Sequence, residues 1–334
     1  MKDVAEDRVP TSATLRVLYA PIQQELQQVE ELISRELCSE YPFVDRLVKY
    51  GVRLGGKRLR PALVLLAGQA CAPLRQDHLV LAAAVEMIHT ATLIHDDVLD
   101  EATLRRHIDT VNSRWDNETS VLLGDYLLAR CLCLVSSVET TFACRTIAEA
   151  SRAMCEGELR QIASRGDYGL TEQDYLGIIT GKTAALTACC CQLGAHYGAA
   201  DAAAEAALTE YGRYLGIAFQ IADDLLDVLG DEATAGKSLG TDLAKQKSTL
   251  PLIRVLQQTS QAERREVVTL LSGTGNHRRD ALRPWLERFD AIAYAQDKAQ
   301  WYARRAAAEL DALPASPTRQ AMQGLTEFVV TRHH

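Results

Sequence analysis

Residues 62–70 read ALVLLAGQA and residues 78–88 read HLVLAAAVEMI. Drawn as helices, both stretches are apolar on more than one side, and such helices belong in the interior of a bundle with other helices around them. Alanine and leucine, which are favourable helix formers, are abundant throughout the chain. These stretches therefore predict an all-α fold with buried central helices.

Helical periodicity extends outward from them almost without interruption. Residues 13–37 carry apolar side chains at steps of three and four residues, which is typical of a helix buried on one side. No low-complexity linker divides the chain, so we predict one helical domain over 1–334, with a motif-bearing core at about 50–258. Further helices are expected near 44–53, 58–71, 77–98, 118–137, 140–164, 171–197, 202–229, 247–258, 261–272, 279–311 and 316–331.

Composition excludes several classes of function. The net charge of −8 argues against nucleic acid as a partner, because its binding needs a basic surface. The nine cysteines form no CxxC pair, which favours reduced thiols over a zinc site. The N-terminal MKDVAEDRVP is too acidic and polar for a targeting signal, and no run approaches the ~18 apolar residues of a membrane span. We expect a cytoplasmic protein without a transmembrane segment, with contact to a membrane surface left open.

An acidic cluster ends the central apolar stretch at residues 93–106, LIHDDVLDEATLRR. Asp96 and Asp100 project from one helix face a turn apart, and two carboxylates ~6 Å apart repel by about 3 kcal/mol at an effective dielectric near 20. Solvent could compensate, and so could magnesium, which takes carboxylate oxygens and bridges to phosphate. Arg105 and Arg106 follow directly, and guanidinium suits phosphate. The pattern favours a metal–diphosphate site over a solvated helix end.

Residues 219–227, FQIADDLLD, repeat this spacing 127 residues later (223 − 96), again at the end of a long apolar helix. If both helices open into the same mouth of the bundle, the clusters could hold metal ions on both sides of one diphosphate. Basic residues follow here too. We expect Lys247 to face the site and Lys245 to be a solvated neighbour.

A third basic segment, GGKRLRP at 55–61, begins an expected helix. Lys57 and Arg60 stand three residues apart there, and a helix N-terminus with basic side chains binds anions. Gly51 to Lys57 has the spacing of a nucleotide-binding P-loop, but Arg58 replaces the serine or threonine and no strand precedes it. We therefore reject a P-loop and retain an anion site.

Together these segments resemble the trans-polyprenyl diphosphate synthase family. The resemblance implies an all-α isoprenoid synthase fold around a central apolar cavity, and a homodimer. It also implies that isopentenyl diphosphate condenses with an allylic diphosphate, such as farnesyl or geranylgeranyl diphosphate. Six ordered motifs carry it, namely GGKRLRP, IHTATLIHDDVLDEATLRR at 88–106, GDYLLAR at 124–130, GKTAAL at 181–186, FQIADDLLD and GKSLGTDLAKQKSTLP at 236–251.

The resemblance also implies roles for individual residues. Magnesium, as three ions per site with substrate bound, would be held by Asp96, Asp97, Asp100, Asp223, Asp224 and Asp227. The allylic diphosphate would contact Arg105, Lys182, Lys237 and Lys247. Isopentenyl diphosphate would be bound by Lys57, Arg60, His89 and Arg106. The reacting carbons would be lined by Phe219, Gln220 and Thr183.

Two positions depart from the family pattern. His107 stands where a glycine commonly follows the two arginines, and Gln246 stands where a glycine often precedes the last lysine. Neither change removes a ligand. They bear on the geometry of two turns.

The residue about one turn before Asp96 is expected to look down the cavity. Here it is Ala91, with Thr92 beside it, and bulky aromatic residues at these positions are associated in the family with short products. Small side chains leave space in a close-packed interior, so we predict a long-chain product of about six to ten isoprene units. The deeper side chains that would stop growth are Met87, Ile88, Leu128 or Leu132.

The expected reaction is ionisation of the allylic diphosphate, condensation, and loss of a proton to the released diphosphate. Three alternatives remain. A short-chain farnesyl or geranylgeranyl diphosphate synthase would differ only in the cavity floor. A terpene cyclase shares the fold but usually lacks a second DDxxD. A non-catalytic partner subunit of a heteromeric synthase usually loses aspartates, whereas this chain keeps all six.

Overall fold

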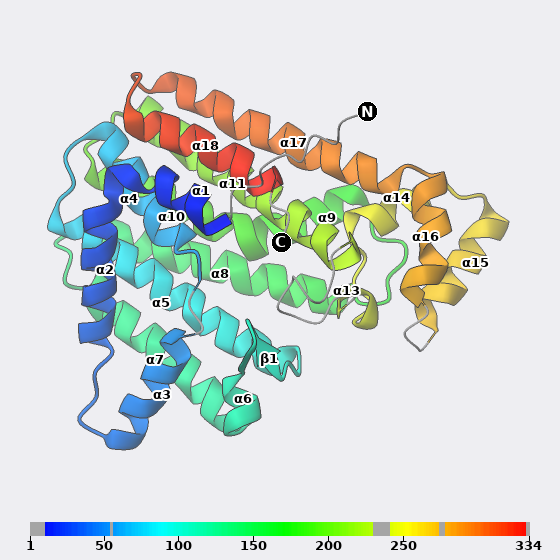
Figure 1. The fold of residues 1–334 in the computed structure, drawn as a ribbon, viewed down its shortest axis with the longest axis horizontal. Helices are drawn as coiled ribbons and strands as arrows, with labels where there is room; N and C mark the ends of the chain where they lie inside the picture. The colour runs from blue at the N-terminus through cyan, green and yellow to red at the C-terminus, as the bar shows by residue number, and fades with distance from the viewer. Residues whose placement is uncertain (1–10, 54–55, 230–240, 274–277, 332–334) are drawn as a thin grey trace, which may run out of the picture.

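The computed structural model describes residues 11–53, 56–229, 241–273 and 278–331. Nearly all of this part of the chain is helical, and a two-stranded antiparallel hairpin is its only sheet (Figure 1). The all-α expectation is confirmed.

The elements of the described residues are two short strands and a series of helices. The strands are β1 Leu104–Arg105 and β2 Ile108–Asp109. The helices are α1 Thr11–Leu18, η1 Ala20–Ile22, α2 Gln23–Glu36, α3 Pro42–Arg53, α4 Leu59–Cys71, α5 Gln76–Leu99, α6 Val111–Arg114, α7 Asn117–Val135, α8 Thr141–Ala163, α9 Glu172–Ile179, η2 Thr180–Ala184, α10 Ala185–Tyr197, α11 Ala202–Leu229, α13 Thr241–Ala244, α14 Leu250–Gln258, α15 Gln261–Ser272, α16 Arg278–Arg288, α17 Ala291–Glu309, η3 Leu310–Ala312 and α18 Pro317–Thr331.

Three helices expected from periodicity are interrupted. The helix expected over 13–37 contains the 3₁₀ turn η1, where Pro21 lacks the N–H that would continue the α-helical ladder. The helix expected over 279–311 divides at Asp290, whose φ of 48° is left-handed. The helix expected over 171–197 contains η2, a π-helical segment of five residues. Apolar periodicity alone does not detect such breaks, because the buried face continues across them.

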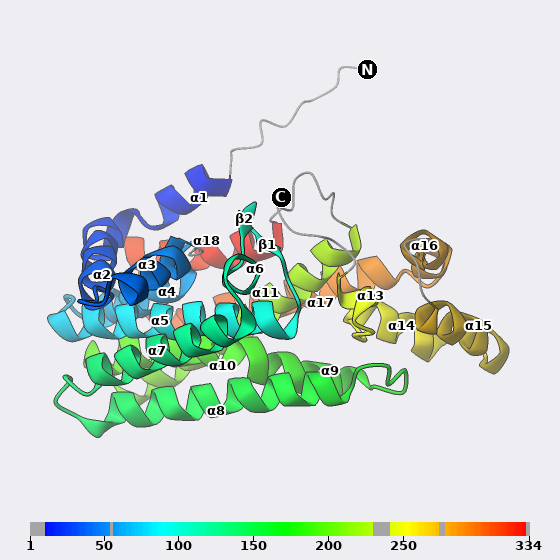
Figure 2. The same cartoon turned by 90° about the horizontal axis from the view of Figure 1, so that it is seen from below.

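The helices α4 and α5, which contain the two quoted apolar stretches, lie in the interior. In α4 every side chain from Ala62 to Ala67 is fully buried. The helix α10 packs against α4, α8 and α11, and α5 packs against α4 and α7. Figure 2 shows α8 and α9 as the outer layer on one side and α1 and α2 on the other. The expectation that apolar helices are surrounded by others is confirmed.

Two helical segments, Gln76–Leu99 and Glu172–Tyr197, are long and apolar enough by composition to cross a membrane. No such segment was expected from uninterrupted apolar runs. Their most apolar windows are 72% and 61% buried inside the structure. Packing against neighbouring helices therefore accounts for their apolar character.

Candidate active site

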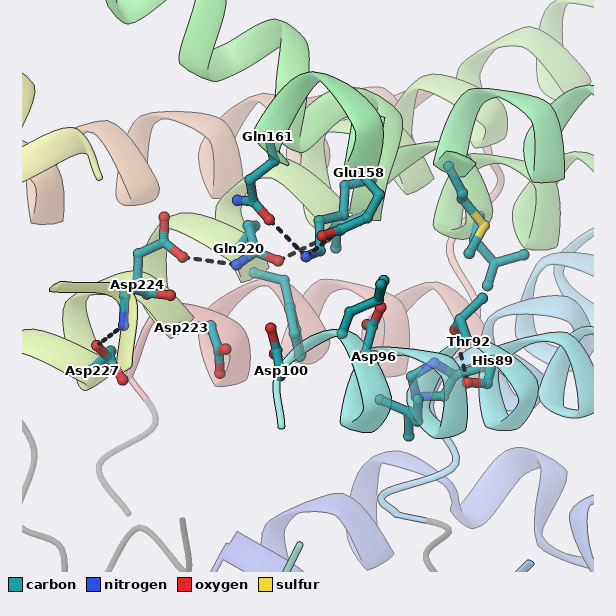
Figure 3. A pocket seen from close by; sticks show the side chains of 18 of the residues that line it. His89, Thr92, Asp96, Asp100, Glu158, Gln161, Gln220, Asp223, Asp224 and Asp227 are labelled. Atoms are coloured by element: carbon teal, nitrogen blue, oxygen red, sulfur yellow. Dashed lines mark hydrogen bonds and ion pairs between the residues drawn. The ribbon is translucent and has the colours of Figure 1, made fainter. Parts of the chain in front are cut away.

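A cavity of about 780 Å³ opens where the last turns of α5 and α11 face each other. Asp96 and Asp100 line one wall, and Asp223, Asp224 and Asp227 line the opposite wall. Figure 3 shows these carboxylates on the two helices, turned toward the same hollow. The two acidic clusters, 127 residues apart in sequence (223 − 96), thus meet across one cavity.

Asp97 does not lie on the cavity wall, although we expected it among the metal ligands. It is only 1% exposed. Arg105 donates to it from both ends of its guanidinium, with Nη2 2.7 Å from Oδ1 and Nε 3.1 Å from Oδ2. Successive helix residues differ by ~100°, so Asp97 faces the β-hairpin while Asp96 faces the cavity. We therefore correct the expectation: Asp97 holds an arginine.

The two acids of the first cluster have different electrostatic environments. Burial raises the pKa of Asp96 to about 6, with Lys182 opposing the shift. Burial also acts to raise the pKa of Asp100, but the hydrogen bond from Lys245 and the charge of Lys247 bring it below its ordinary value. A cation beside Asp96 would favour its charged form and reverse the effect of burial.

A hydrogen-bonded chain holds the second cluster. Tyr175 donates its O–H to Asp224 Oδ2 at 2.6 Å, and Gln220 Nε2 donates to Asp224 Oδ1 at 2.8 Å. Thr183 Oγ1 in turn donates to Gln220 Oε1 at 2.7 Å. Burial, followed by the charge of Asp242, raises the pKa of Asp224, and the bond from Tyr175 opposes this. Sequence reasoning missed Tyr175, because its role arises only where α9 packs against α11.

The π-helical segment η2 carries Lys182 and Thr183 to the cavity wall. A π-turn interrupts the regular helical hydrogen bonds and occurs frequently at functional sites. Lys182 Nζ lies 2.8 Å from Gln161 Oε1 and 2.5 Å from Glu158 Oε2, both of which lie on α8 (Figure 3). The π-helical segment was not expected from the sequence, and neither were the two partners of Lys182 on α8.

Glycines allow η2 and α8 to approach each other closely. A Cβ on Gly181 would lie 2.8 Å from the carbonyl oxygen of Ala153. We expect Gly181→Ala to force the two helices apart and lower the free energy of unfolding by about 1–3 kcal/mol, as measured by urea denaturation. The control is Gly273→Ala, where a Cβ would meet nothing nearer than 3.4 Å. Equal stability of the two variants would contradict the prediction.

An ion pair between Lys245 and Asp100 connects the two sides of the cavity. Lys247 Nζ lies 3.1 Å from Asp242 Oδ1 beside it. Lys247 lines the cavity as expected, but the prediction that Lys245 is solvated was wrong. The intervening Gln246 has a left-handed φ of 53°, and this turn brings both flanking lysines to the cavity.

The hairpin directs two successive arginines to different places. Its two-residue turn consists of Arg106 and His107, whose φ values of 53° and 62° fit a type I′ turn. Arg105 binds Asp97, while Arg106 reaches the loop at Gly56. A Cβ on Gly56 would lie only 2.5 Å from Arg106 Nη1, so a larger residue there would require the Arg106 guanidinium to move.

Both departures from the family pattern fall on left-handed residues. His107 and Gln246 have positive φ, the conformation that glycine adopts without steric cost. Non-glycine residues adopt it at a cost of roughly 1–2 kcal/mol each. The turns are therefore formed without glycine.

Basic residues line the other end of the cavity. Lys57, Arg60, His89 and Arg106 all contribute to its wall there. The Lys57 ammonium lies 5.6 Å from the centre of the Phe328 ring, which α18 supplies. Burial and the surrounding arginines lower the pKa of His89 well below its ordinary value, so its imidazole is neutral. The cavity thus has an acidic end and a basic end, which we call the acidic pole and the basic pole.

Apolar side chains line the space between and beneath the poles. Phe219 from α11, Met154 from α8 and Leu186 from α10 contribute to the wall. Thr92 also lines it, whereas Ala91 is fully buried and lies outside the lining residues. We expected Ala91 to look down the cavity, but a one-residue step around the helix gives that place to Thr92.

The side chains proposed to stop chain growth divide into two groups. Met87 and Ile88 are buried in α5, and Leu128 packs partly buried against the core. Leu132 is 61% exposed on the outer side of α7. Leu132 is therefore not part of a cavity floor within this chain.

The donor set fits a hard divalent cation that is shared with substrate. Carboxylate oxygens from both helices reach one cavity, and magnesium is usually held by one or two carboxylates together with water and substrate phosphate. Among the described residues, no three acidic, histidine or cysteine side chains form a complete metal cage. Oxygen atoms of a diphosphate would complete the coordination.

A family model described as polyprenyl synthetase matches residues 41–287. The chain belongs to this family. Most of the residues that the resemblance singled out meet in one place. The cavity of this polyprenyl synthetase brings together Lys57, Arg60, His89, Thr92, Asp96, Asp100, Arg105, Arg106, Lys182, Thr183, Phe219, Gln220, Asp223, Asp224, Asp227 and Lys247. Lys237 lies outside the described residues.

The polyprenyl synthetase is similar over most of its length to curated long-chain enzymes. It is 36% identical over 313 residues to the octaprenyl diphosphate synthase of Escherichia coli, covering 92% of this chain and 96% of that one. It is also 36% identical over 317 residues to an all-trans-nonaprenyl-diphosphate synthase of Rhodobacter capsulatus, covering 94% and 97%. Heptaprenyl diphosphate synthase component 2 of Bacillus subtilis is 31% identical over 317 residues, covering 95% and 90%.

Solved structures agree with the fold of this polyprenyl synthetase. A polyprenyl synthase from Caulobacter crescentus, complexed with calcium and isoprenyl diphosphate, superposes with a TM-score of 0.89. The two sequences are 35% identical, and the match covers 95% of this chain and 98% of that one.

Proposed function

We propose that this polyprenyl synthetase condenses isopentenyl diphosphate with an allylic diphosphate to form a long-chain all-trans polyprenyl diphosphate. The observation that carries the proposal is the meeting of two carboxylate sets across one cavity whose other end is basic. Two diphosphates could bind at these poles, with the apolar wall between them. The names of the similar enzymes support this substrate class.

The acidic pole would bind and ionise the allylic substrate. Magnesium, as three ions, would be held by Asp96 and Asp100 from one side and by the second cluster from the other, and it would neutralise the departing diphosphate. Lys182, Lys247 and Arg105 would add positive charge to the leaving group, as preorganised electrostatic catalysis requires. In the structure these three cations already have acidic partners.

The basic pole would hold isopentenyl diphosphate. Lys57, Arg60 and Arg106 provide positive charge, and neutral His89 can donate one hydrogen bond. The double bond would then face the allylic carbon beside Phe219. Burial of this region excludes water from the cation. The proton lost after condensation would pass to the released diphosphate.

The proposed product has about six to ten isoprene units. The side chain of Thr92 in the cavity wall is small, and in an otherwise close-packed interior a small side chain leaves space for a long product. The deciding experiment incubates the purified chain with farnesyl diphosphate, labelled isopentenyl diphosphate and magnesium, and separates the products by chromatography. A ladder ending at long chains is expected. Geranylgeranyl diphosphate as the end product, or farnesyl diphosphate as the end product when geranyl diphosphate is the primer, would refute the long-chain assignment. Cyclised hydrocarbons would indicate a terpene cyclase, and inactivity of the chain alone a partner subunit.

We further propose one domain, a homodimer and a cytoplasmic location, with no nucleic-acid partner and a peripheral membrane contact for product release. The outer side of α7 supports the dimer, because Val121 and Leu132, which are about three turns apart on one face, and the neighbouring Leu122 are exposed there. Exposed apolar patches of this kind mark interaction sites. Light scattering after size exclusion should give twice the 36.7 kDa chain mass. A monomeric mass would contradict the dimer.

Magnesium affinity should depend on pH through Asp96. Its pKa of about 6 means that a proton occupies the carboxylate below that pH and competes with the cation. We expect apparent magnesium affinity to fall by about tenfold per pH unit below pH 6 and to level off above it. Calorimetric titration with magnesium from pH 5 to 8 would measure this. An unchanged profile in Asp96→Asn would contradict the assignment.

The same shift has a consequence for stability. Because folding raises the pKa of Asp96 above 3.8, the folded protein binds more protons than the unfolded chain between pH 4 and 6. Without a cation, the contribution of Asp96 to stability therefore falls as the pH rises through this range.

A further inference from the structure

The loop that ends at α4 supplies Lys57 to the basic pole, the first turn of α4 supplies Arg60, and the loop contains a third cation with a different environment. Arg58 lies between them, and its guanidinium is bound by carboxylates of two other helices. Nη2 donates to Glu30 Oε2 on α2 at 2.9 Å, and Nη1 donates to Glu86 Oε1 on α5 at 2.7 Å. Nε also donates to Glu30. Arg58 thus joins the loop to two helices that lie apart in the sequence.

The backbone of this loop depends on those anchors. Arg58 has a left-handed φ of 51° at the N-cap of α4, a conformation that costs a non-glycine residue roughly 1–2 kcal/mol. Such strain persists where surrounding contacts over-determine the conformation. The hydroxyl of Tyr19 supplies one more contact, donating to the Lys57 carbonyl at 3.0 Å. The direction of the Lys57 and Arg60 side chains therefore follows from where Arg58 is held.

Glu86 is the buried half of the anchor. It is 3% exposed, and its Oε2 has no hydrogen-bond partner. The Nε of Arg60 is also buried and has no hydrogen-bond partner. A buried charge is costly unless another charge compensates it. Burial raises the pKa of Glu86 and lowers that of Arg60, and the attraction between Glu86 and the arginines at positions 58 and 60 opposes both shifts, so it favours the charged forms of all three groups.

We propose that Glu86, assisted by Glu30, is a positioning residue for isopentenyl diphosphate. It acts through Arg58, which it fixes so that Lys57 and Arg60 converge on the diphosphate. Its negative charge also reduces the repulsion between the positively charged side chains of the basic pole. The inference deepens the proposed function and rests on it.

The test uses Glu86→Gln, which keeps the size of the side chain and removes its charge. We expect KM for isopentenyl diphosphate to rise by at least about tenfold, because misplacement of binding groups by a fraction of an ångström is costly. KM for farnesyl diphosphate should change less than twofold. Glu86→Asp should recover part of the loss. Calorimetric binding of isopentenyl diphosphate alone, without an allylic substrate, should show the same weakening.

A matched control is available on α2. Glu36 pairs with Arg130 at 3.1 Å and does not line the cavity, so Glu36→Gln removes a partly exposed ion pair from α2, the helix that carries Glu30. It should leave both KM values unchanged. If Glu86→Gln fails to fold, Glu30→Gln decides the question, because Glu30 is the more exposed half of the same anchor.

The outcomes separate two failures. If the unaltered chain does not join the two diphosphates, the proposed function fails. If the unaltered chain is active and the folded Glu86→Gln or Glu30→Gln variant keeps its affinity for isopentenyl diphosphate, only the positioning role is overturned. Equal losses of affinity for both substrates would also overturn it, because a general structural defect would not distinguish the poles.

Discussion

Replacing Asp96 or Asp223 with alanine should lower kcat by about a thousandfold or more. Each variant removes one carboxylate from the set that would hold the magnesium ions, and these ions would stabilise the charge on the departing diphosphate by several kcal/mol. Each 1.36 kcal/mol of lost transition-state stabilisation lowers the rate tenfold. The two residues lie on opposite walls of the cavity, so either change disrupts this set. Steady-state rates at saturating allylic diphosphate, isopentenyl diphosphate and magnesium would quantify the loss of kcat.

The fold should survive these changes. Burial raises the pKa of Asp96, so its charged form is a cost to the folded state. The unfolding midpoint of Asp96→Ala should therefore equal or exceed that of the unaltered chain. Asp297→Ala, on the exposed side of α17, provides a control that should be unchanged in rate and stability. Retained turnover in both active-site variants would contradict the mechanism.

Asp97 offers a contrast within the same motif. Burial raises the pKa of Asp97 as it does that of Asp96, but Arg105 opposes the shift through a direct hydrogen bond, so Asp97→Ala leaves a guanidinium without its partner. Breaking a buried pair from one side costs about 3–5 kcal/mol. We expect Asp97→Ala to lower the unfolding midpoint, whereas Asp96→Ala does not. Differential scanning calorimetry of the two variants would show whether adjacent aspartates have these different roles. Identical midpoints would contradict the division.

The sequence allowed the two acidic clusters to be placed correctly because helical geometry is local. Asp96 and Asp100 share a face by a rotation of ~40°, and this required no knowledge of neighbouring helices. To predict that the second cluster faces the first, it was also necessary that two helices distant in sequence end at the same opening of the bundle. Repetition of a costly motif predicted it, and the cavity lined by both sets bears it out.

What sequence reasoning missed depends on contacts between distant segments. Asp97 has a different role from Asp96 because the hairpin brings Arg105 to it. The type I′ turn of that hairpin contains no glycine, so the sequence did not indicate the turn. Tyr175 belongs to the site because α9 packs against α11. Lys245 reaches Asp100 because Gln246 turns the chain with a positive φ. Each is a consequence of tertiary packing that local propensity does not contain.

Thr92→Phe should convert the enzyme to a short-chain synthase with products of about three or four isoprene units. A phenyl ring would fill the space that the small threonine side chain leaves in an otherwise close-packed interior. Thr92 lines the cavity next to Asp96, so the ring would extend into the path of the growing chain. Chromatography of products made from labelled isopentenyl diphosphate would measure the change. The condensation rate should be retained, because no charged group is altered.

Ala91→Phe is the informative comparison. The residues differ by one position, but Ala91 is fully buried and lies outside the cavity lining. A phenyl ring there must displace packed neighbours, at a cost of about 1–3 kcal/mol. We expect it to shorten the product only by distorting the wall, with a lower unfolding midpoint that Thr92→Phe does not share. Shortening by Ala91→Phe at unchanged stability, with a long product from Thr92→Phe, would show that Ala91 and not Thr92 limits the chain.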